Sequence, residues 1–335
     1  MAHLVESMAY VGETPWHGLG NQLPQKQPIE VWAQAAGMDW HIKESPVHFS
    51  IENIHNASMF GTFEDQKVLY RSDSNQALSV VSSRYQVVQP LEVLEFYRDL
   101  TEYAGFELET AGVLKGGRKF WALAKTGHST ALKGNDVVNG YLLLATSCDG
   151  SLATVAMPTT VRVVCNNTLS IAVNNSENAV KVSHRSVFDA DAVKQRLGVA
   201  VSHWDQFMYE MKVLSERKVS TKEANAYFET LLTQTTPQST ESTPSGLRLL
   251  KPSTKPIIPN ERAYKKLQAM YGGQGRGAEL TAAKNTAWGL LCAVTEFVDH
   301  ERQARSTENR LDSAWFGNGA QMKQQALEKA LQLMS

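Results

Sequence analysis

Apolar side chains recur every three or four residues through most of the second half of the chain. The clearest run extends from Val193 to Leu214, and this spacing is typical of an amphipathic helix. Ser220 and Glu223 then form a capping box, which marks the start of the next helix. Further helices are predicted over residues 261–271, 279–302 and 320–334. Four large side chains of these helices are expected to point inward: Trp204, Phe207, Trp288 and Leu291.

The middle of the chain is predicted to form β-hairpins. Glu107–Leu114 and Lys119–Lys125 are rich in strand-forming residues, and Lys115-Gly116-Gly117-Arg118 between them is typical of a tight turn. A second hairpin is expected to join Val138–Thr146 to Leu152–Met157, because Asp149-Gly150 is a common turn pair. Thr159–Val164 is predicted to be another strand. Asn167 or Thr168 then caps an expected short helix that carries Leu169 to Val173.

The first 80 residues are predicted to form a mixed lobe, followed by a helix. Pro28–Ala36 is typical of a short helix, and Pro90–Tyr103 of a strong amphipathic helix that ends at Gly105. Short strands are expected at residues 47–51, 67–71 and 77–81.

Together these elements predict an α+β fold. An antiparallel β-sheet core with packed helices, over roughly residues 40–175, is followed by a mainly helical C-terminal half. The predicted divisions are a mixed lobe (1–80), the sheet core (81–185), a helical region (186–233), a flexible linker (234–260) and C-terminal helices (261–335). The linker is expected because residues 233–260 contain five prolines and show no apolar periodicity.

Composition is that of an ordinary globular protein, with 42% apolar and 20% charged residues. No apolar run reaches the length that spans a bilayer, and no secretory signal is visible. Cys148, Cys165 and Cys292 are scattered and lack CxxC spacing, which fits a reducing cytoplasm. Cys148 and Cys165 are interpreted as buried thiols rather than nucleophiles.

Charge is unevenly distributed although the net charge is only −1. Residues 1–70 contain three lysines and eight acidic residues, whereas residues 244–277 contain seven basic residues and one glutamate. Residues 115–133 contain five basic and no acidic residues, with Phe120 and Trp121 among them.

A basic ribbon with interleaved aromatic residues predicts single-stranded nucleic-acid binding, in which Trp121 would stack on bases if it faces outward. An exposed hairpin with solvated charges is the alternative. The candidate nucleic-acid-binding residues are Lys115, Arg118, Lys119, Trp121, Lys125, Lys133, Arg162, Lys251, Lys255, Lys265, Lys266 and Arg276.

Other clusters are weighed against structural roles. Trp16-His17-Gly18-Leu19-Gly20 is best interpreted as a structural turn anchored by the tryptophan. Residues 272–277, Gly-Gly-Gln-Gly-Arg-Gly, suggest a phosphate-tolerant hinge at a helix start, or a plain helix cap followed by a loop. Arg162, in an apolar segment, must be paired or must face a ligand such as phosphate.

Metal chemistry finds little support in the sequence. Glu296, Asp299 and His300 share about one helical turn and are interpreted as a surface ion-pair group. Asp65-Gln66-Lys67 has the short spacing of some metal-dependent nucleases but lacks a convincing upstream carboxylate. No metal, cofactor or catalytic residue is therefore predicted, and the pattern favours a non-enzymatic protein.

Several motifs together resemble the phage/plasmid-like family, of the domain of unknown function 932 type. They are Thr14–Gly20, Ser147–Ser151, Arg162–Leu169, Thr286–Gly289 and Val298–His300. The family tends to place His where Cys148 stands. The resemblance implies a protein of phages, plasmids and integrative elements in the bacterial cytoplasm, without an established enzyme activity.

A more distant similarity, in topology alone, is to single-strand annealing proteins of the Red-beta and RecT type. It rests on the helix at 90–103, the hairpin, further antiparallel strands and the helix at 167–173. It implies DNA held along a basic groove in a homo-oligomer, with a phage exonuclease or a host protein as a further partner, and no membrane. The alternatives are a non-enzymatic host-interaction or assembly protein without DNA binding, and a metal-dependent nuclease.

Overall fold

The computed structural model describes residues 7–12, 20–51, 59–162, 167–170, 179–201, 204–234 and 260–334. The chain forms two compact units. Unit 1 comprises residues 1–130, 137–209 and 304–312, and unit 2 comprises residues 131–136, 210–303 and 313–335. The predicted α+β class, with helices concentrated in the C-terminal half, is confirmed.

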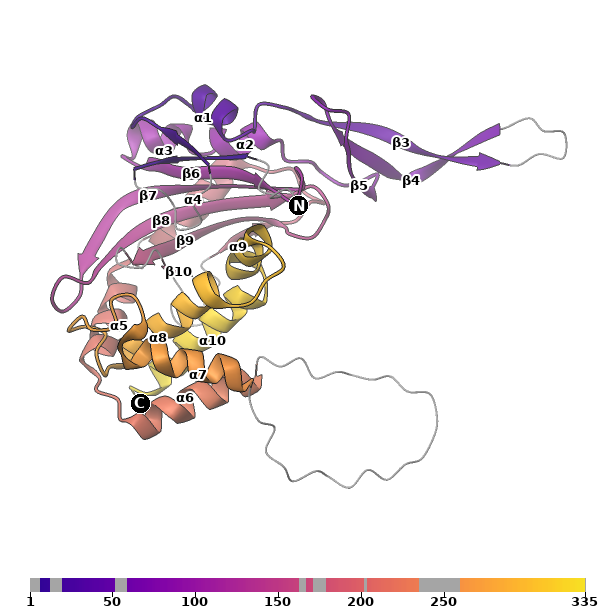
Figure 1. Cartoon of the computed structure of the whole chain (residues 1–335). Coiled ribbons are helices and arrows are strands. Elements are labelled where there is room, and N and C mark those ends of the chain that lie inside the picture. Colours follow the sequence, from indigo (N-terminus) through magenta and orange to yellow (C-terminus); the bar gives the residue numbers. More distant parts are fainter. Residues whose placement is uncertain are drawn as a thin grey trace, which may run out of the picture. The chain divides into compact units, whose positions relative to one another are not determined.

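Unit 1 is built on an eight-stranded sheet with the order β10-β9-β8-β7-β6-β1-β2, and β11 also pairs with β9 (Figure 1). The hairpin pairs β6–β7 and β8–β9 are antiparallel, as is β1–β6, whereas β1 and β2 run parallel. The strands are β1 (Ser7–Val11), β2 (Asn21–Leu23), β6 (Glu107–Leu114), β7 (Lys119–Ala131), β8 (Val137–Ser147), β9 (Thr154–Arg162), β10 (Asn167–Ser170) and β11 (Val180–Val182).

Four helices of unit 1 complete its core: α1 (Ile29–Ala35), α2 (Pro90–Glu95), α3 (Arg98–Tyr103) and α4 (Ala190–Val201). The predicted helix at 90–103 is therefore present but interrupted between α2 and α3. Tyr97, at this break, is fully buried and donates hydrogen bonds to the carbonyl oxygens of Ala122 (2.9 Å) and Leu142 (3.0 Å). Its hydroxyl thus ties the helix break to β7 and β8.

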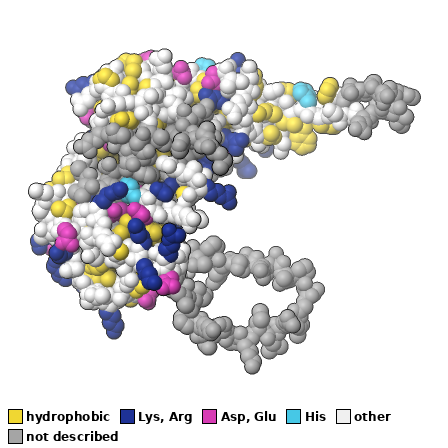
Figure 2. Space-filling view, viewed as in Figure 1, with side chains coloured by type: hydrophobic (Ala, Val, Ile, Leu, Met, Phe, Trp, Pro, Cys, Tyr) yellow, Lys and Arg dark blue, Asp and Glu magenta, His cyan; other side chains and the backbone are white. Residues whose placement is uncertain are grey.

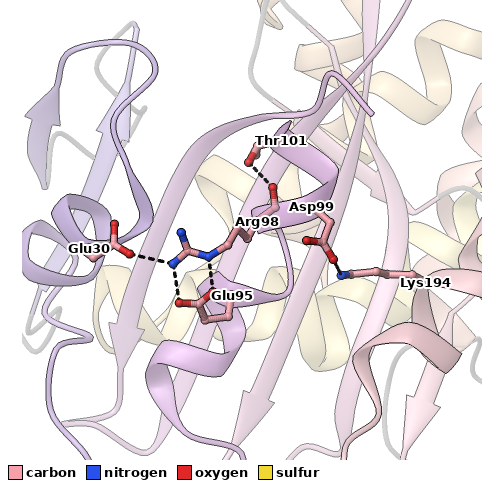
Figure 3. Close-up of polar contacts among 6 residues, drawn as sticks. All are labelled: Glu30, Glu95, Arg98, Asp99, Thr101 and Lys194. Carbon is pink, nitrogen blue, oxygen red and sulfur yellow. Dashed lines mark hydrogen bonds and ion pairs between the residues drawn. The ribbon is translucent and has the colours of Figure 1, made fainter. Parts of the chain in front are cut away.

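Ion pairs link these helices to one another (Figure 3). Arg98 donates from Nε to Glu95 at 2.6 Å and from Nη2 to Glu30 at 2.8 Å, which joins α3 to α2 and α1. The two carboxylates hold the pKa of Arg98 above its ordinary value, and the bond from Arg98 lowers that of Glu30. Lys194 of α4 bonds Asp99 of α3 at 2.8 Å. This network is structural because each of its charges has a partner within the helical layer.

A second, three-stranded sheet has the order β3-β4-β5 and projects from the rest of unit 1 (Figure 1). Its strands are β3 (Ile42–Ile51), β4 (Met59–Arg71) and β5 (Ala77–Ser82), and β5 pairs only with the proximal part of β4. We call this sheet the arm. The three strands were predicted, but β3 and β4 are much longer than the sequence indicated.

Unit 2 is helical. It contains most of α5 (Trp204–Glu216), then α6 (Thr221–Gln234), α7 (Glu261–Ala269), the π-helical turn η1 (Met270–Gln274), α8 (Ala287–Glu296), the π-helical turn η2 (Phe297–Glu301), part of α9 (Thr307–Phe316) and α10 (Asn318–Gln332). The capping box is confirmed: the backbone N–H of Ser220 donates to Glu223, and that of Glu223 donates to the Ser220 hydroxyl. The four large side chains predicted to point inward are buried.

Three local predictions are wrong. Residues 167–170 form the strand β10, where Thr168 pairs with Val161 of β9, instead of the start of a helix. The two strands expected around Pro158 are one strand, β9. The helix expected from residue 279 begins at Ala287, after the Thr286 cap. In each case pairing with a distant segment outweighs the local signal. The region 235–259, which holds the predicted linker, lies outside the described residues.

In the described part of the chain, no helix combines the length and apolar character needed to cross a membrane.

Candidate functional site

The turn predicted to grip nucleic acid closes the β6–β7 hairpin. Leu114 and Lys119 are its last paired residues, and the N–H of Arg118 donates to the Leu114 carbonyl at 3.1 Å. Lys115, Gly116 and Gly117 all have positive φ values, of 58°, 64° and 92°. Two adjacent glycines meet this backbone requirement with little strain, which explains the motif.

Two lysines of this hairpin are engaged by α9. Lys119 is only 7% exposed and forms a 2.5 Å ion pair with Asp312. Lys115 donates to the Asn309 side chain at 2.5 Å and lies 3.7 Å from Asp312. A buried, paired lysine is a poor phosphate ligand, because binding would require it to leave its carboxylate.

Trp121 does not fit the predicted stacking role. It is 2% exposed, and Phe120 beside it is fully buried, so neither ring is open to a base. Arg162 is likewise buried, at 3% exposure on β9. Lys125 is more open but pairs with Glu109 at 2.5 Å. The hairpin therefore contributes to the core and to ion pairs at least as much as to a basic surface.

The remaining candidates are more dispersed. Lys133, Lys265, Lys266 and Arg276 belong to unit 2, where Lys265 pairs with Glu261 and Lys266 with Glu301. Arg118 and Lys133 are exposed, and the described part of the chain offers neither of them an ion pair. Lys251 and Lys255 lie outside the described residues.

The glycine-rich loop at residues 272–277 already holds an anionic group of the protein. The backbone N–H of Arg276 donates to the Glu296 carboxylate at 2.9 Å. A Cβ at Gly275 would lie 2.9 Å from the same carboxylate oxygen, so glycine is what allows Glu296 to approach. Glu296 thus takes the position in which the sequence suggested a phosphate.

The interpretation of Glu296, Asp299 and His300 as a surface group is wrong. All three are buried, and Asp299 forms a 2.9 Å ion pair with the equally buried Lys323 of α10. The sequence could not show this, because the partner is on a distant helix. Across the described residues, no group of three or more side chains could hold a metal ion.

The Ser147–Ser151 turn supports the base of the arm. The hydroxyl of Ser79 on β5 donates to the Cys148 carbonyl at 2.5 Å, and Tyr85 donates to the Ser147 carbonyl at 2.9 Å. The Cys148 N–H in turn donates to the Arg118 carbonyl at 2.8 Å. Cys148 is buried as predicted, and burial raises the pKa of its thiol to about 12. Cys165 and residues 14–19 lie outside the described part of the chain.

The β6–β7 turn supports the arm as well. A Cβ at Gly117 would lie 3.1 Å from the Leu78 side chain on β5 and 3.2 Å from the Trp40 ring, which also packs edge-on against Phe120. We call residues 115–118 and 147–151 together the socket. Both turns singled out in the sequence therefore hold the arm in place.

The distal arm presents an unpaired apolar face that the sequence did not single out. Val47 lies opposite Phe63, and Phe49 opposite Gly61, in the antiparallel β3–β4 register, so their side chains share one face with Ile51. Phe49, Phe63 and Ile51 are 49%, 46% and 42% exposed. We call Val47, Phe49, Ile51 and Phe63 the apolar face, and Figure 2 shows hydrophobic side chains gathered on the arm.

The opposite side of the same ribbon is more polar. His48 and Thr62 are paired there through a 3.2 Å hydrogen bond, and Ser50 lies opposite Phe60. Phe60 is the most exposed phenylalanine of the arm, at 71%. The alternation Val47-His48-Phe49-Ser50-Ile51 was a signal for this two-sidedness, although it could not show that the apolar side is left uncovered.

Fold and site thus define an α+β protein with a socketed β arm and without a recognisable catalytic centre among its described residues. A comparison with protein families matches residues 77–315 to the family described as Domain of unknown function (DUF932). This match covers well over half of the chain, so the protein belongs to that family, and the predicted family is confirmed to this extent. No curated protein and no solved structure matches the chain significantly.

Proposed function

We propose that this protein is a non-enzymatic interaction protein of a phage or mobile element, and that it docks on a protein partner through the apolar face of its arm. The observation that carries the proposal is the set of half-exposed side chains Phe49, Ile51 and Phe63 on one side of a projecting ribbon. Scattered single apolar residues are common on surfaces, but a contiguous group of large ones marks an interaction site.

The ribbon's energetics support a docking role. A two-stranded hairpin is marginally stable in water unless its apolar face packs on something. Beyond the reach of β5 the arm is such a hairpin, because β5 pairs with residues 66–70 of β4 only. Burial of exposed apolar area stabilises by roughly 25 cal/mol per Å². A partner would therefore both stabilise the distal arm and gain affinity from it.

The arm's charges favour a protein over a polyanion. Lys43, Lys67 and Arg71 are balanced by Glu44, Glu64 and Asp65 within β3 and β4. Two of the cations are already paired, Lys67 with Glu44 at 2.8 Å and Arg71 with Asp73 at 2.7 Å. The arm therefore has no excess of positive charge that would attract phosphate groups.

A photo-crosslinking amino acid placed at residue 63 tests the docking role, with residue 60 on the opposite side as the matched control. In cells expressing the full chain, position 63 should give one defined crosslinked protein, identified by mass spectrometry, and position 60 should not. The adduct should disappear when Phe49→Lys is added. Equal products from both positions, or none from position 63, would contradict the proposal.

Single-stranded nucleic-acid binding, as in a strand-annealing factor, is a second proposal. It is favoured by Arg118, which is exposed at the tip of the β6–β7 turn with no ion pair in the described part of the chain, beside the partly exposed Lys115. Surface ion pairs contribute only about 0–1 kcal/mol, so phosphate groups can displace a carboxylate from Lys115. Because Trp121 is buried, this binding would rest on backbone charge and not on stacking.

Fluorescence anisotropy with a labelled oligonucleotide tests the second proposal. Affinity should fall with salt at a log–log slope of roughly −0.7 per phosphate contact. Arg118→Ala should reduce that slope, whereas Lys284→Ala, which removes an exposed lysine paired with Glu279, is the control. If Arg118→Ala has the same salt slope as the parent, or if the parent does not bind at low salt, the proposal is wrong.

A further inference from the structure

We infer that the partner of the apolar face is a second copy of this chain, which applies its own apolar face to the first. This inference rests on the proposed docking function and names its partner. The resulting dimer would be isologous, since each arm contributes the same residues to the contact.

The first argument is the absence of charge. Among Val47–Ile51 and residues 59–63 there is no Asp, Glu, Lys or Arg. A surface without charge is complementary to itself, because pairing two copies buries no unpaired ion. A partner with charged groups at the centre of its surface would instead have to desolvate them against Phe49 and Phe63 without compensation.

The second argument is shape. The Phe49 ring lies over Gly61, where the missing side chain leaves room for it. Along β3 the face therefore alternates branched aliphatic and aromatic side chains, in the order Val47, Phe49 and Ile51. Two such twisted ribbons can stack as the inner faces of a small β-sandwich do, about 10 Å apart.

The exposed apolar area bears on the strength of the contact. Phe49 and Phe63 together expose about one whole aromatic side chain, roughly 150–250 Å². Ile51 adds to this exposed area. Val80, near the base of the arm, is 55% exposed and adds to it as well. It lies on the same side as Val47, because Val80 pairs with Val68 and Val68 pairs with Ser45 of β3. This falls below the roughly 800 Å² per partner of a standard stable interface. The dimer is therefore weak and reversible, and the monomer is populated at low concentration.

The free edge of β3 is a less suitable contact than the face. Pro46 lies near the middle of β3, and proline interrupts the row of donors that an added strand would use. The β3–β4 register also shifts between Pro46 and Val47, where β4 carries the additional residues Glu64, Asp65 and Gln66. Such an irregularity bends and twists the ribbon away from edge-to-edge pairing.

Sedimentation velocity on the full chain over a hundredfold range of concentration tests the inference. The parent should shift from monomer to dimer as concentration rises. Phe63→Lys should raise the dissociation constant about tenfold or more, the effect of losing a central contact. Phe60→Lys makes the same chemical change on the opposite side of the ribbon and should behave as the parent.

A second variant of the apolar face, Phe49→Ser, removes an aromatic ring without adding a charge, so it shows whether the effect of Phe63→Lys comes from the charge alone. Circular dichroism should give parent-like spectra for Phe63→Lys, Phe60→Lys and Phe49→Ser. A parent that stays monomeric, or equal dissociation constants for Phe63→Lys and Phe60→Lys, would overturn the inference. The crosslinking experiment separates this failure from that of the docking role. If position 63 captures a different protein, the docking role stands and the second copy is excluded as its partner.

Discussion

The ring of Phe49 lies directly across Gly61 on the neighbouring strand, so that a Cβ at residue 61 would lie only 2.5 Å from it. Glycine weakens a strand because it has no side chain to pack, and an aromatic ring from the adjacent strand can cover the gap. Position 61 therefore controls how Phe49 is presented on the apolar face.

Gly61→Ala should change the arm's surface more than its stability. The atoms in conflict belong to the far end of an exposed phenylalanine, which can rotate away. We expect a change in the free energy of unfolding below about 1 kcal/mol, measured by urea unfolding, together with weaker dimerisation in sedimentation. A large loss of stability with unchanged association would contradict this view of the contact.

Gly117→Ala should destabilise the protein more than Gly116→Ala. Both glycines have positive φ, so each substitution introduces left-handed strain of roughly 1–2 kcal/mol. Residue 116 has open space around it, whereas a methyl group at 117 would press on Leu78 and Trp40, which adds overpacking of about 1–3 kcal/mol. Equal free energies of unfolding for the two variants would show that the socket does not clamp the base of the arm.

Alkaline pH should destabilise the protein in part through Cys148. Burial raises the pKa of this thiol to about 12 in the folded protein, whereas an unfolded thiol ionises at about 8.5. Between these values the unfolded chain binds fewer protons than the folded one, so the free energy of unfolding falls as pH rises. The free energy of unfolding is therefore unaffected by Cys148 below about pH 8.5 and falls progressively from there toward pH 12.

Urea unfolding at pH 8 and pH 10 measures this effect, with Cys148→Ala as the comparison. The variant should lose less stability than the parent over that interval. Burial also raises the pKa of Tyr85 to about 12, but this tyrosine is present in both proteins and so cancels in the difference. Parallel pH profiles would contradict the assignment.

Lys323→Met should be strongly destabilising. It leaves Asp299 buried without its 2.9 Å partner, a situation that typically costs about 3–5 kcal/mol. Adding Asp299→Asn removes the buried negative charge that Lys323 neutralised, so the double variant should recover part of the loss. If the double variant is less stable than Lys323→Met in thermal unfolding, the pair does not act through charge neutralisation.

The parts of the fold that local signals determine could be predicted from the sequence. The β6–β7 turn follows from Gly116-Gly117, and the start of α6 follows from Ser220 and Glu223. The strand β10 was mistaken for a helix because Asn167 and Thr168 suit a helix cap, while their pairing with β9 depends on the tertiary fold. The length of β4 was missed because Glu64, Asp65 and Gln66 interrupt its apolar alternation.

The candidate site was less predictable than the fold. Lys115 and Arg118 lie on the predicted turn, but Asp312, which pairs with Lys119 at the start of β7, is 193 residues away in the sequence. Likewise, nothing near residue 272 indicates that Glu296 fills the glycine-rich loop. Charge patterns show where cations lie along a chain, whereas long-range folding decides which of them are already neutralised.

The socket has a consequence for how this chain can be divided. The family match begins at residue 77, the first residue of β5. A fragment cut at that boundary would keep the strand that anchors the arm through Ser79 and Cys148 but would lose β3 and β4. In such a fragment β5 would lack its partner strand β4, and its unpaired edge would be prone to aggregation. For recombinant work, the boundary that keeps this unit intact lies upstream of β1, because β1 pairs with β6 in the main sheet.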